Sequence, residues 1–123
     1  MGKKIVVVDD DPQILQMLKK LLENEGYEVH TASNGVEAKE VWDKAEAELL
    51  ITDIVMPEKE GLDLILELQR DYPSIKVVAI SGGDRIEPEY YLELAQILGA
   101  YKTLTKPFNP QVLLETVEEL LES

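Results

Sequence analysis

Short apolar runs alternate along the chain with longer stretches in which apolar residues recur every three or four positions. The first run, Lys4 to Val8, is rich in β-branched residues without polar alternation, which is typical of a strand buried on both faces of a parallel sheet. Asp11 and Pro12 then predict a helix start, because an acidic cap and a proline suit the first helical positions. Gly26 ends this helix, whose apolar residues at helical spacing are Ile14, Leu15, Leu18, Leu21 and Leu22.

The same strand and helix pattern repeats along the chain. Further strands are predicted over residues 28–32, 49–52, 76–80 and 103–105, and further helices over 34–45, 61–70 and 88–98, with a last helix that starts at Asn109 and Pro110. In the second helix Glu37 follows a capping Asn34 by three residues, and the predicted apolar positions are Val36, Ala38, Val41, Trp42 and Ala45. Five strands that alternate with five helices predict an α/β fold, a doubly wound parallel sheet with right-handed crossovers.

Composition adds limits on size, partners and compartment. A chain of 123 residues with 45% hydrophobic residues is one domain with enough apolar material for a core. Its formal net charge of −13 opposes binding to phosphate backbones or anionic lipid, which excludes a stand-alone DNA-binding protein. It has no cysteine, and no apolar run is long enough for a signal sequence or a membrane span. We therefore expect a reducing, cytoplasmic location.

Polar side chains follow the predicted strands at the edge where such sheets bind ligands. Strand one is followed by Asp9 to Asp11, strand three by Asp53, strand four by Ser81, and strand five by Lys106. Carboxylates that lie close together repel one another unless a proton, a divalent cation or an ammonium group relieves them. Oxygen ligands without histidine or cysteine favour Mg²⁺, and a carboxylate pair beside a lysine and a hydroxyl suits phosphoryl chemistry. Asp53 is the candidate nucleophile.

Four segments resemble the receiver domain of two-component response regulators, of the stand-alone single-domain type. Each alone is weak evidence, but together, in this order on these strands, they are specific. The resemblance covers the whole chain, residues 1–123, and implies a flavodoxin-like fold with strand order 2-1-3-4-5. The segments are Val6-Val7-Val8-Asp9-Asp10-Asp11, Asp53-Ile54-Val55-Met56-Pro57 with Gly61 beyond it, Ala79-Ile80-Ser81-Gly82 and Leu104-Thr105-Lys106-Pro107-Phe108.

The resemblance implies a role for each residue of the metal site. Asp10 and Asp53 are expected to ligate Mg²⁺ directly, and Asp9 to hold it through water. The backbone carbonyl of Val55 matches the remaining protein ligand, which a residue of any type can supply.

The same resemblance implies phosphorylation of Asp53. Its carboxylate would attack the phosphorus of a phosphohistidine on a sensor histidine kinase or histidine phosphotransfer protein. Ser81 and Lys106 would each bind a phosphoryl oxygen, which supplies the positioning and positive charge that phosphoryl transfer needs. A cis peptide bond before Pro107 is also implied. Phosphorylation would then move the loop after strand four and change the contacts with a downstream protein effector.

The chain departs from the family pattern in three places. Thr103 stands where the family usually has an aromatic residue three positions before the lysine, and Tyr101 lies two residues earlier. The segment from Ser81 to Lys106 is about one helical turn longer than usual. Val55 and Gly83 occupy positions that tune dephosphorylation, and neither side chain can orient water. We therefore expect slow intrinsic loss of the phosphoryl group, and a half-life of seconds in purified protein would contradict this.

Several residues have a structural interpretation instead of a chemical one. Asp11 is expected to be a helix cap, and His30, the single histidine, a strand-edge residue away from the acidic cluster. Trp42 lies at helical spacing from small alanines and is expected to fill the core. In the fourth helix, Tyr91 fits the buried stripe, which leaves Tyr90 facing outward as a candidate partner contact.

Other functions fit these residues less well than the receiver interpretation does. Asp9 and Asp11 imitate the start of a haloacid-dehalogenase-like phosphatase motif, but Gln13 fails its Thr/Val position. A flavin or nucleotide binder would need a glycine-rich phosphate loop, which the sequence lacks. A degenerate receiver that binds without phosphate is opposed by the presence of every expected site residue. The sequence leaves open whether the chain acts alone or belongs to a longer regulator.

Overall fold

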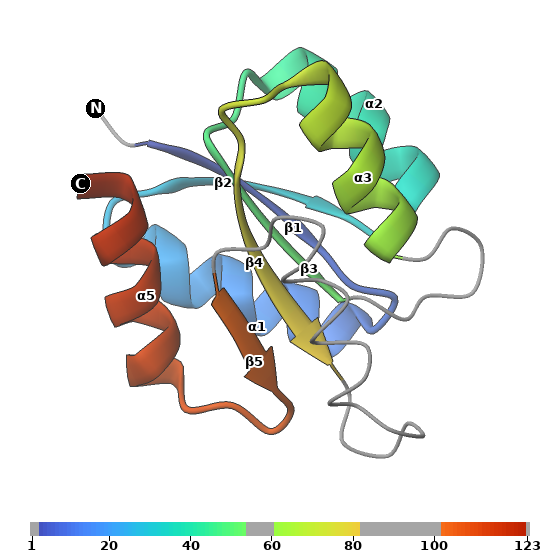
Figure 1. The fold of residues 1–123 in the computed structure, drawn as a ribbon. Coiled ribbons are helices and arrows are strands. Elements are labelled where there is room, and N and C mark those ends of the chain that lie inside the picture. The colour runs from blue at the N-terminus through green and yellow to red at the C-terminus, as the bar shows by residue number, and fades with distance from the viewer. Residues whose placement is uncertain (1–2, 54–60, 82–101, 123) are drawn as a thin grey trace.

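The strands form one parallel sheet in the computed structural model, which describes residues 3–53, 61–81 and 102–122. Its strands lie in the order β2-β1-β3-β4-β5 (Figure 1). This confirms the predicted sheet and its order. The strands are β1 (Lys4–Val8), β2 (Glu28–Ala32), β3 (Leu49–Asp53), β4 (Lys76–Ser81) and β5 (Lys102–Thr105).

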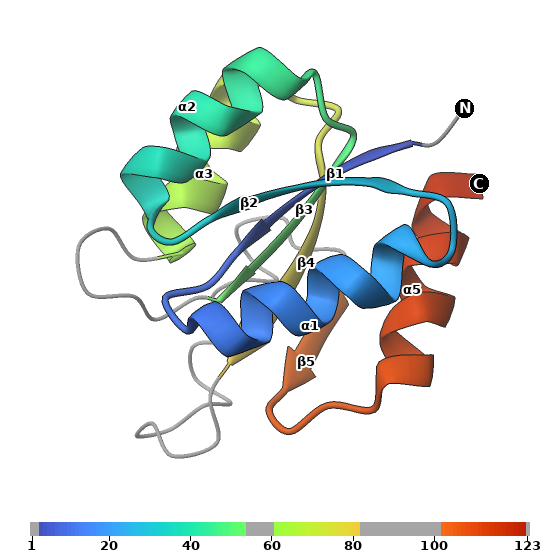
Figure 2. The ribbon, with the colours of Figure 1, turned by 180° about the vertical axis from the view of Figure 1, so that it is seen from behind.

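Helices cover both faces of the sheet. One face carries α2 (Gly35–Ala45) and α3 (Gly61–Asp71), and the other carries α1 (Pro12–Glu23) and α5 (Pro110–Glu122), as Figures 1 and 2 show from opposite sides. This arrangement is a doubly wound sheet. The chain crosses from β1 to β2 in one direction and from β2 to β3 and β4 in the other, and right-handed crossovers in opposite directions put helices on opposite faces. The helix predicted over residues 88–98 lies outside the described residues.

The two faces bury separate apolar clusters. Along β3 the side chains alternate between them: Leu50 belongs to the cluster under α2 and α3, and Leu49 and Ile51 to the cluster under α1 and α5. All five residues of β3 are buried, as expected for a central strand of a parallel sheet. Trp42 is 3% exposed in the first cluster, which confirms its predicted core role.

The helix starts follow the predicted capping. The Asp11 carboxylate accepts a hydrogen bond from the Gln13 N–H at 2.9 Å, and the Asn34 side-chain oxygen accepts one from the Glu37 N–H at 2.8 Å. One predicted apolar position is wrong. Val36 is 54% exposed, because it lies in the first turn of α2 and the buried stripe of this helix runs through Ala38, Trp42 and Ala45.

Leucines of α3 offer a matched test of this packing. Leu68 is fully buried, whereas Leu66 on the same helix is 54% exposed. We expect Leu68→Ala to lower the free energy of unfolding by about 2 to 5 kcal/mol, since it removes buried methyl groups and leaves a cavity. Leu66→Ala, with the same change in helix propensity, should stay within about 0.5 kcal/mol of the wild type. Urea unfolding followed by circular dichroism measures both, and equal losses would contradict the assigned face of α3.

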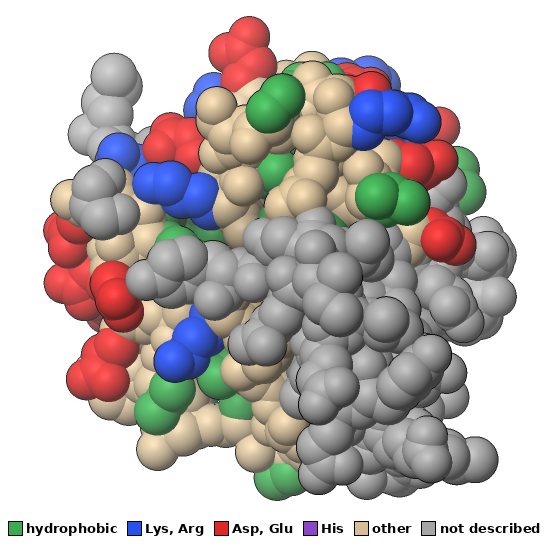
Figure 3. Space-filling view, in the orientation of Figure 1, with side chains coloured by type: hydrophobic (Ala, Val, Ile, Leu, Met, Phe, Trp, Pro, Cys, Tyr) green, Lys and Arg blue, Asp and Glu red, His purple; other side chains and the backbone are tan. Residues whose placement is uncertain are grey.

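Acidic side chains dominate one edge of the molecule. Figure 3 shows Asp and Glu side chains gathered along the edge that α5 forms, where the exposed residues are Glu115, Glu118, Glu119 and Glu122. Such an edge repels polyanions. In the part of the chain that the structure describes, no helix has the length and apolar character needed to cross a membrane.

Candidate functional site

The carboxyl ends of β1 and β3 bring the predicted acidic residues together with the lysine that follows β5. The Lys106 Nζ lies 2.7 Å from Asp9 Oδ2 and 3.1 Å from Asp53 Oδ2. One oxygen from each of Asp9, Asp10 and Asp53 can be chosen so that all lie within 4.8 Å of one another. Four of the residues predicted from the sequence therefore form a single cluster.

The pairing of parallel strands explains this convergence. Val8 in β1 pairs with Thr52 in β3, so the residues that follow them, Asp9 and Asp53, end neighbouring strands at the same level. Lys106 reaches the pair from the end of β5. The side chains are largely buried: Asp9 is 2% exposed, Asp53 6% and Lys106 20%.

Both oxygens of Asp9 are already engaged. Oδ1 accepts a hydrogen bond from the Asp11 N–H at 2.9 Å, and Oδ2 accepts one from Lys106 Nζ. A direct metal bond to Asp9 would have to share an oxygen with one of these donors. Asp10, by contrast, is exposed to solvent at the rim of the cluster.

Burial disfavours the charged carboxylates of this cluster unless positive charge lies close to them. It raises the pKa of Asp9 above the ordinary value, while hydrogen bonds from Lys106 and the Asp11 N–H oppose the rise. For Lys106, burial acts to lower the pKa, but the hydrogen bond to Asp9 and the charge of Asp53 outweigh it and raise the pKa. Lys106 therefore carries its charge at neutral pH and acts as a counter-ion for both carboxylates.

The donor set suits a hard divalent cation. The three clustered side chains offer only carboxylate oxygens, the ligands that Mg²⁺ and Ca²⁺ prefer. Mg²⁺ binds through one or two carboxylates and keeps several waters, and this matches a site where Asp9 is tied to other donors and Asp10 faces solvent. The residues present thus fit a metal site of the predicted kind.

Other predicted residues have different outcomes. Val55 lies outside the described residues, as do Tyr90, Tyr91, Tyr101 and Gly83. Ser81 is the last residue of β4, at the same edge of the sheet as the acidic cluster. The cis peptide bond between Lys106 and Pro107 is present, as the resemblance implied.

His30 was assigned a structural role and lies as expected, and the structure also describes the position of Thr103 in β5. His30 is on the edge strand β2, where its Nε2 is 2.7 Å from a Glu28 carboxylate oxygen, and it takes no part in the acidic cluster. Thr103, which replaces the usual aromatic residue, is part-buried in β5 and pairs with Ala79 of β4.

Two contacts to the cluster were missed by the sequence analysis. Asp11 was predicted only to cap α1, yet its N–H also holds Asp9. The Thr52 hydroxyl donates a hydrogen bond to the backbone carbonyl of Asp53 at 2.8 Å. The available signal was a hydroxyl residue that interrupts an apolar strand directly before the candidate nucleophile.

Comparison with known proteins places this chain in a family. Residues 5–118 match the sequence model of the response regulator receiver domain. The chain belongs to this family. It is a receiver domain of two-component response regulators, and the family is a signalling switch rather than a conventional enzyme.

Solved receiver domains have the same fold. A CheY-like receiver domain from Methanospirillum hungatei is 33% identical, with a TM-score of 0.88, over 99% of this chain and 95% of the other. The chemotaxis protein CheY4 of Vibrio cholerae is 31% identical, with a TM-score of 0.87, over 98% of this chain and 99% of the other.

Curated relatives of this receiver domain are longer proteins. The transcriptional regulatory protein CpxR of Klebsiella pneumoniae is 34% identical over 96% of this chain and 49% of its own length. For GlrR of Escherichia coli the identity is 33%, over 96% of this chain and 26% of its own length. The receiver domain thus spans between about a quarter and a half of these relatives.

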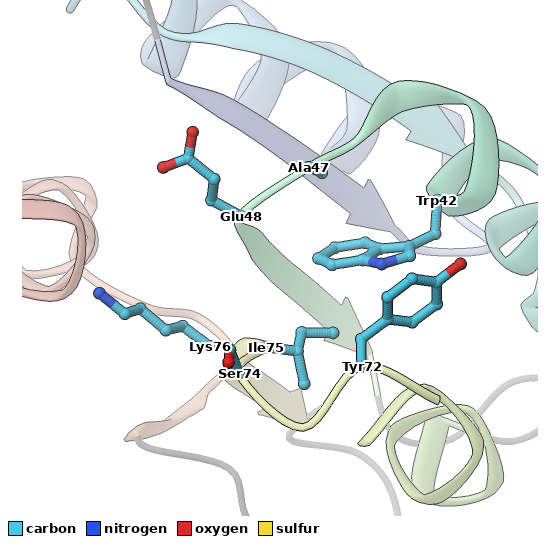
Figure 4. Close-up of a pocket in the computed structure, with 7 residues that line it drawn as sticks. All are labelled: Trp42, Ala47, Glu48, Tyr72, Ser74, Ile75 and Lys76. Atoms are coloured by element: carbon cyan, nitrogen blue, oxygen red, sulfur yellow. The ribbon is translucent and has the colours of Figure 1, made fainter. Parts of the chain in front are cut away.

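A hollow of about 320 Å³ lies at the amino-terminal ends of β3 and β4, whereas the acidic cluster lies at the carboxyl ends of the strands. Figure 4 shows the residues that line the hollow. On one side Trp42 and Tyr72 meet edge to face, with ring centroids 6.1 Å apart. On the other side Lys76 extends toward α5, where its Nζ donates to the Leu120 carbonyl at 2.6 Å, and Glu48 pairs with Lys3 at 3.7 Å. Both charged groups that line the hollow are therefore engaged in contacts within the fold.

The Tyr72 hydroxyl beside this hollow gives a pH-dependent contact. It donates a hydrogen bond to the Asp43 carboxylate, which raises the pKa of Tyr72 above its ordinary value. The folded state then holds this proton more tightly than the unfolded chain, so the associated stability is present below about pH 10 and is lost as pH rises through the folded pKa.

We expect Tyr72→Phe to flatten the alkaline fall in stability. The free energy of unfolding in urea, measured at pH values on both sides of pH ~10, should decline less steeply in the variant than in the wild type. The pKa of Tyr27 is also raised, but Tyr27 is present in both proteins, so its contribution to the slope cancels in the comparison. Identical slopes would show that the hydroxyl contact with Asp43 does not persist in solution.

Proposed function

We propose that this receiver domain, residues 1–123, takes a phosphoryl group onto Asp53 in a Mg²⁺-dependent reaction and signals through changed protein contacts. The observation that carries the proposal is the position of Lys106, whose ammonium lies within hydrogen-bond distance of Asp9 and Asp53 together. A structural salt bridge needs one carboxylate. Two buried carboxylates share one ammonium, and a third carboxylate lies at the rim, so the site is built for further positive charge.

In the proposed reaction a carboxylate oxygen of Asp53 attacks phosphorus. The new O–P bond forms as the P–N bond to a histidine of the donor breaks, and the imidazole leaves with the electron pair. Lys106 compensates charge on a phosphoryl oxygen, and the Ser81 hydroxyl binds another. Because phosphoryl transfer depends mainly on positioning and charge compensation, these groups and their burial supply what the reaction requires.

Mg²⁺ would be held by Asp10, Asp53 and the carbonyl of Val55, with Asp9 acting through water. The outer role of Asp9 is supported by its two existing hydrogen bonds, to Lys106 and to the Asp11 N–H. Bound there, the metal supplies positive charge to the phosphoryl oxygens. The domain would catalyse its own phosphorylation and dephosphorylation and act on no other substrate.

The proposed partners are proteins. Upstream we propose a sensor histidine kinase or a histidine phosphotransfer protein, and downstream a protein effector. A sensor kinase, CckA of Brucella abortus, is itself 32% identical over 96% of this chain and 12% of its own length. The acidic edge of α5 and the net charge of −13 argue against direct contact with nucleic acid or anionic membranes. A cytoplasmic location belongs to the same proposal, since a chain without cysteine needs no oxidising compartment.

The test is the intact mass of the purified protein after incubation with acetyl phosphate. We expect one adduct of about 80 Da, the mass of a phosphoryl group, when Mg²⁺ is present and none when EDTA replaces it. An adduct that hydroxylamine removes would be an acyl phosphate on a carboxylate. If neither acetyl phosphate nor a phosphorylated histidine phosphotransfer protein produces an adduct, this result would favour a receiver that binds partners without phosphate.

A further inference from the structure

Thr52 is a buried polar residue directly before the proposed phosphoacceptor, and the reaction proposed above gives it no role. It is fully buried in β3. Its neighbours on the adjoining strands are Val8 and Ala79, both members of the apolar cluster under α2 and α3. Its side chain therefore lies on the opposite face of the sheet from that of Asp53, because successive strand residues alternate.

Packing does not account for a hydroxyl at this position. Valine has nearly the same shape and an equal preference for strands, and it would put a methyl group where the hydroxyl now lies. A buried hydroxyl costs stability unless it makes a hydrogen bond. The bond that it makes goes to the carbonyl of Asp53, at 2.8 Å.

This bond acts on the backbone that carries the nucleophile. Asp53 is the last residue of β3, and its carbonyl belongs to the peptide from which the chain continues toward Val55. The side chain of threonine has few accessible rotamers in a packed strand, so its hydroxyl is a firm anchor for this carbonyl. Fixing the carbonyl limits rotation about the backbone of Asp53, on which the direction of its carboxylate toward Lys106 depends.

We propose that Thr52 is a positioning residue, whose hydroxyl fixes the backbone of Asp53 and so aims its carboxylate at the metal and the phosphoryl group. The inference rests on the proposed function. It means that a side chain on the face of β3 opposite to the Asp53 side chain helps to set the geometry of the site.

The test compares Thr52→Val with Thr52→Ser. Valine keeps the shape and removes the donor, whereas serine keeps the donor and removes a methyl group. We expect Thr52→Val to take up phosphoryl groups from acetyl phosphate about tenfold more slowly, and to bind Mg²⁺ about tenfold more weakly by calorimetry, as is typical when a residue that orients a ligand is lost. Its midpoint of thermal unfolding is measured alongside, because the buried Asp53 carbonyl loses a donor, which lowers stability, while a buried hydroxyl becomes a methyl group, which raises it.

Thr52→Ser should retain the wild-type rate and Mg²⁺ affinity within about twofold, despite a lower unfolding midpoint from the lost methyl group. Rate and Mg²⁺ affinity would then follow the presence of the hydroxyl rather than the unfolding midpoint, which a merely structural role would not produce. The proposal is overturned if Thr52→Val matches the wild type in both rate and affinity, or if Thr52→Ser is as impaired as Thr52→Val.

Failure of the proposed function gives a different result. If the wild type itself takes no phosphoryl group from any donor, that function falls, and the Mg²⁺ affinities alone decide the role of Thr52. Weaker Mg²⁺ binding in Thr52→Val, restored in Thr52→Ser, would still support the positioning role. Equal affinities in all three proteins would refute it.

Discussion

Asp53→Asn is expected to abolish the phosphoryl adduct that acetyl phosphate and Mg²⁺ produce on the wild type. The amide has no anionic oxygen to attack phosphorus, and the variant also loses one of the charges that would hold the metal. The folded protein should survive, because asparagine has nearly the same volume as aspartate and relieves repulsion with Asp9. Intact-mass spectrometry measures the adduct, and circular dichroism verifies the fold.

Asp11→Asn is the matched control for this experiment. Asp11 belongs to the same acidic run, but its side chain caps α1, and only its backbone N–H contacts Asp9. Asparagine keeps the capping oxygen, so we expect a normal adduct in this variant. An adduct of undiminished yield in Asp53→Asn would place the phosphoryl group on another residue.

Lys106→Met is expected to slow phosphoryl uptake by about 10²- to 10³-fold, the range seen when one preorganised group that stabilises transition-state charge is removed. Methionine preserves most of the apolar stem and removes the ammonium that lies 2.7 Å from Asp9 and 3.1 Å from Asp53. Single-turnover uptake, followed by intact mass over time, measures the effect. Lys102→Met in the same strand-to-helix region is the control, because Lys102 is exposed on β5 and should react at the wild-type rate.

The same variant should also change the response of stability to Mg²⁺. Without the ammonium, the buried Asp9 and Asp53 have lost their counter-ion, so the variant should unfold at a lower temperature than the wild type in EDTA. Mg²⁺ should then raise its unfolding midpoint by more than it raises that of the wild type, because it replaces a missing charge. Equal Mg²⁺ shifts together with equal uptake rates would contradict the role assigned to Lys106.

Most of the fold followed from patterns that are local in sequence. Unbroken β-branched runs such as Lys4 to Val8 exist only where both faces of a strand are buried, and this requirement predicts a parallel sheet with helices on both sides. Asp11 and Asn34 predicted helix starts within a residue, since a cap bonds to the N–H groups of its own first turn. The prediction for Val36 was wrong, because the apolar character of a residue does not specify on which side of the first helical turn it lies.

The candidate site was also foreseeable in part. Polar residues at the ends of successive parallel strands must meet at one edge, so the approach of Asp9, Asp10 and Asp53 follows from strand order alone. Local pattern could not give the division of labour among them. Asp9 accepts hydrogen bonds at both oxygens, from Lys106 and from the Asp11 N–H, and this depends on how two segments 97 residues apart are oriented.

The sequence by itself determined the order of strands and helices, the family, and the residue types that meet at the carboxyl edge of the sheet, because each of these depends on periodicity, capping and short motifs. Only the tertiary structure decided which carboxylates share the Lys106 ammonium, and that Thr52 holds the Asp53 carbonyl from the opposite face. It also decided that Tyr72 joins Asp43 and Trp42 across 29 and 30 residues of chain. Such contacts depend on the placement of side chains to within a few tenths of an ångström, which packing sets and residue patterns do not encode.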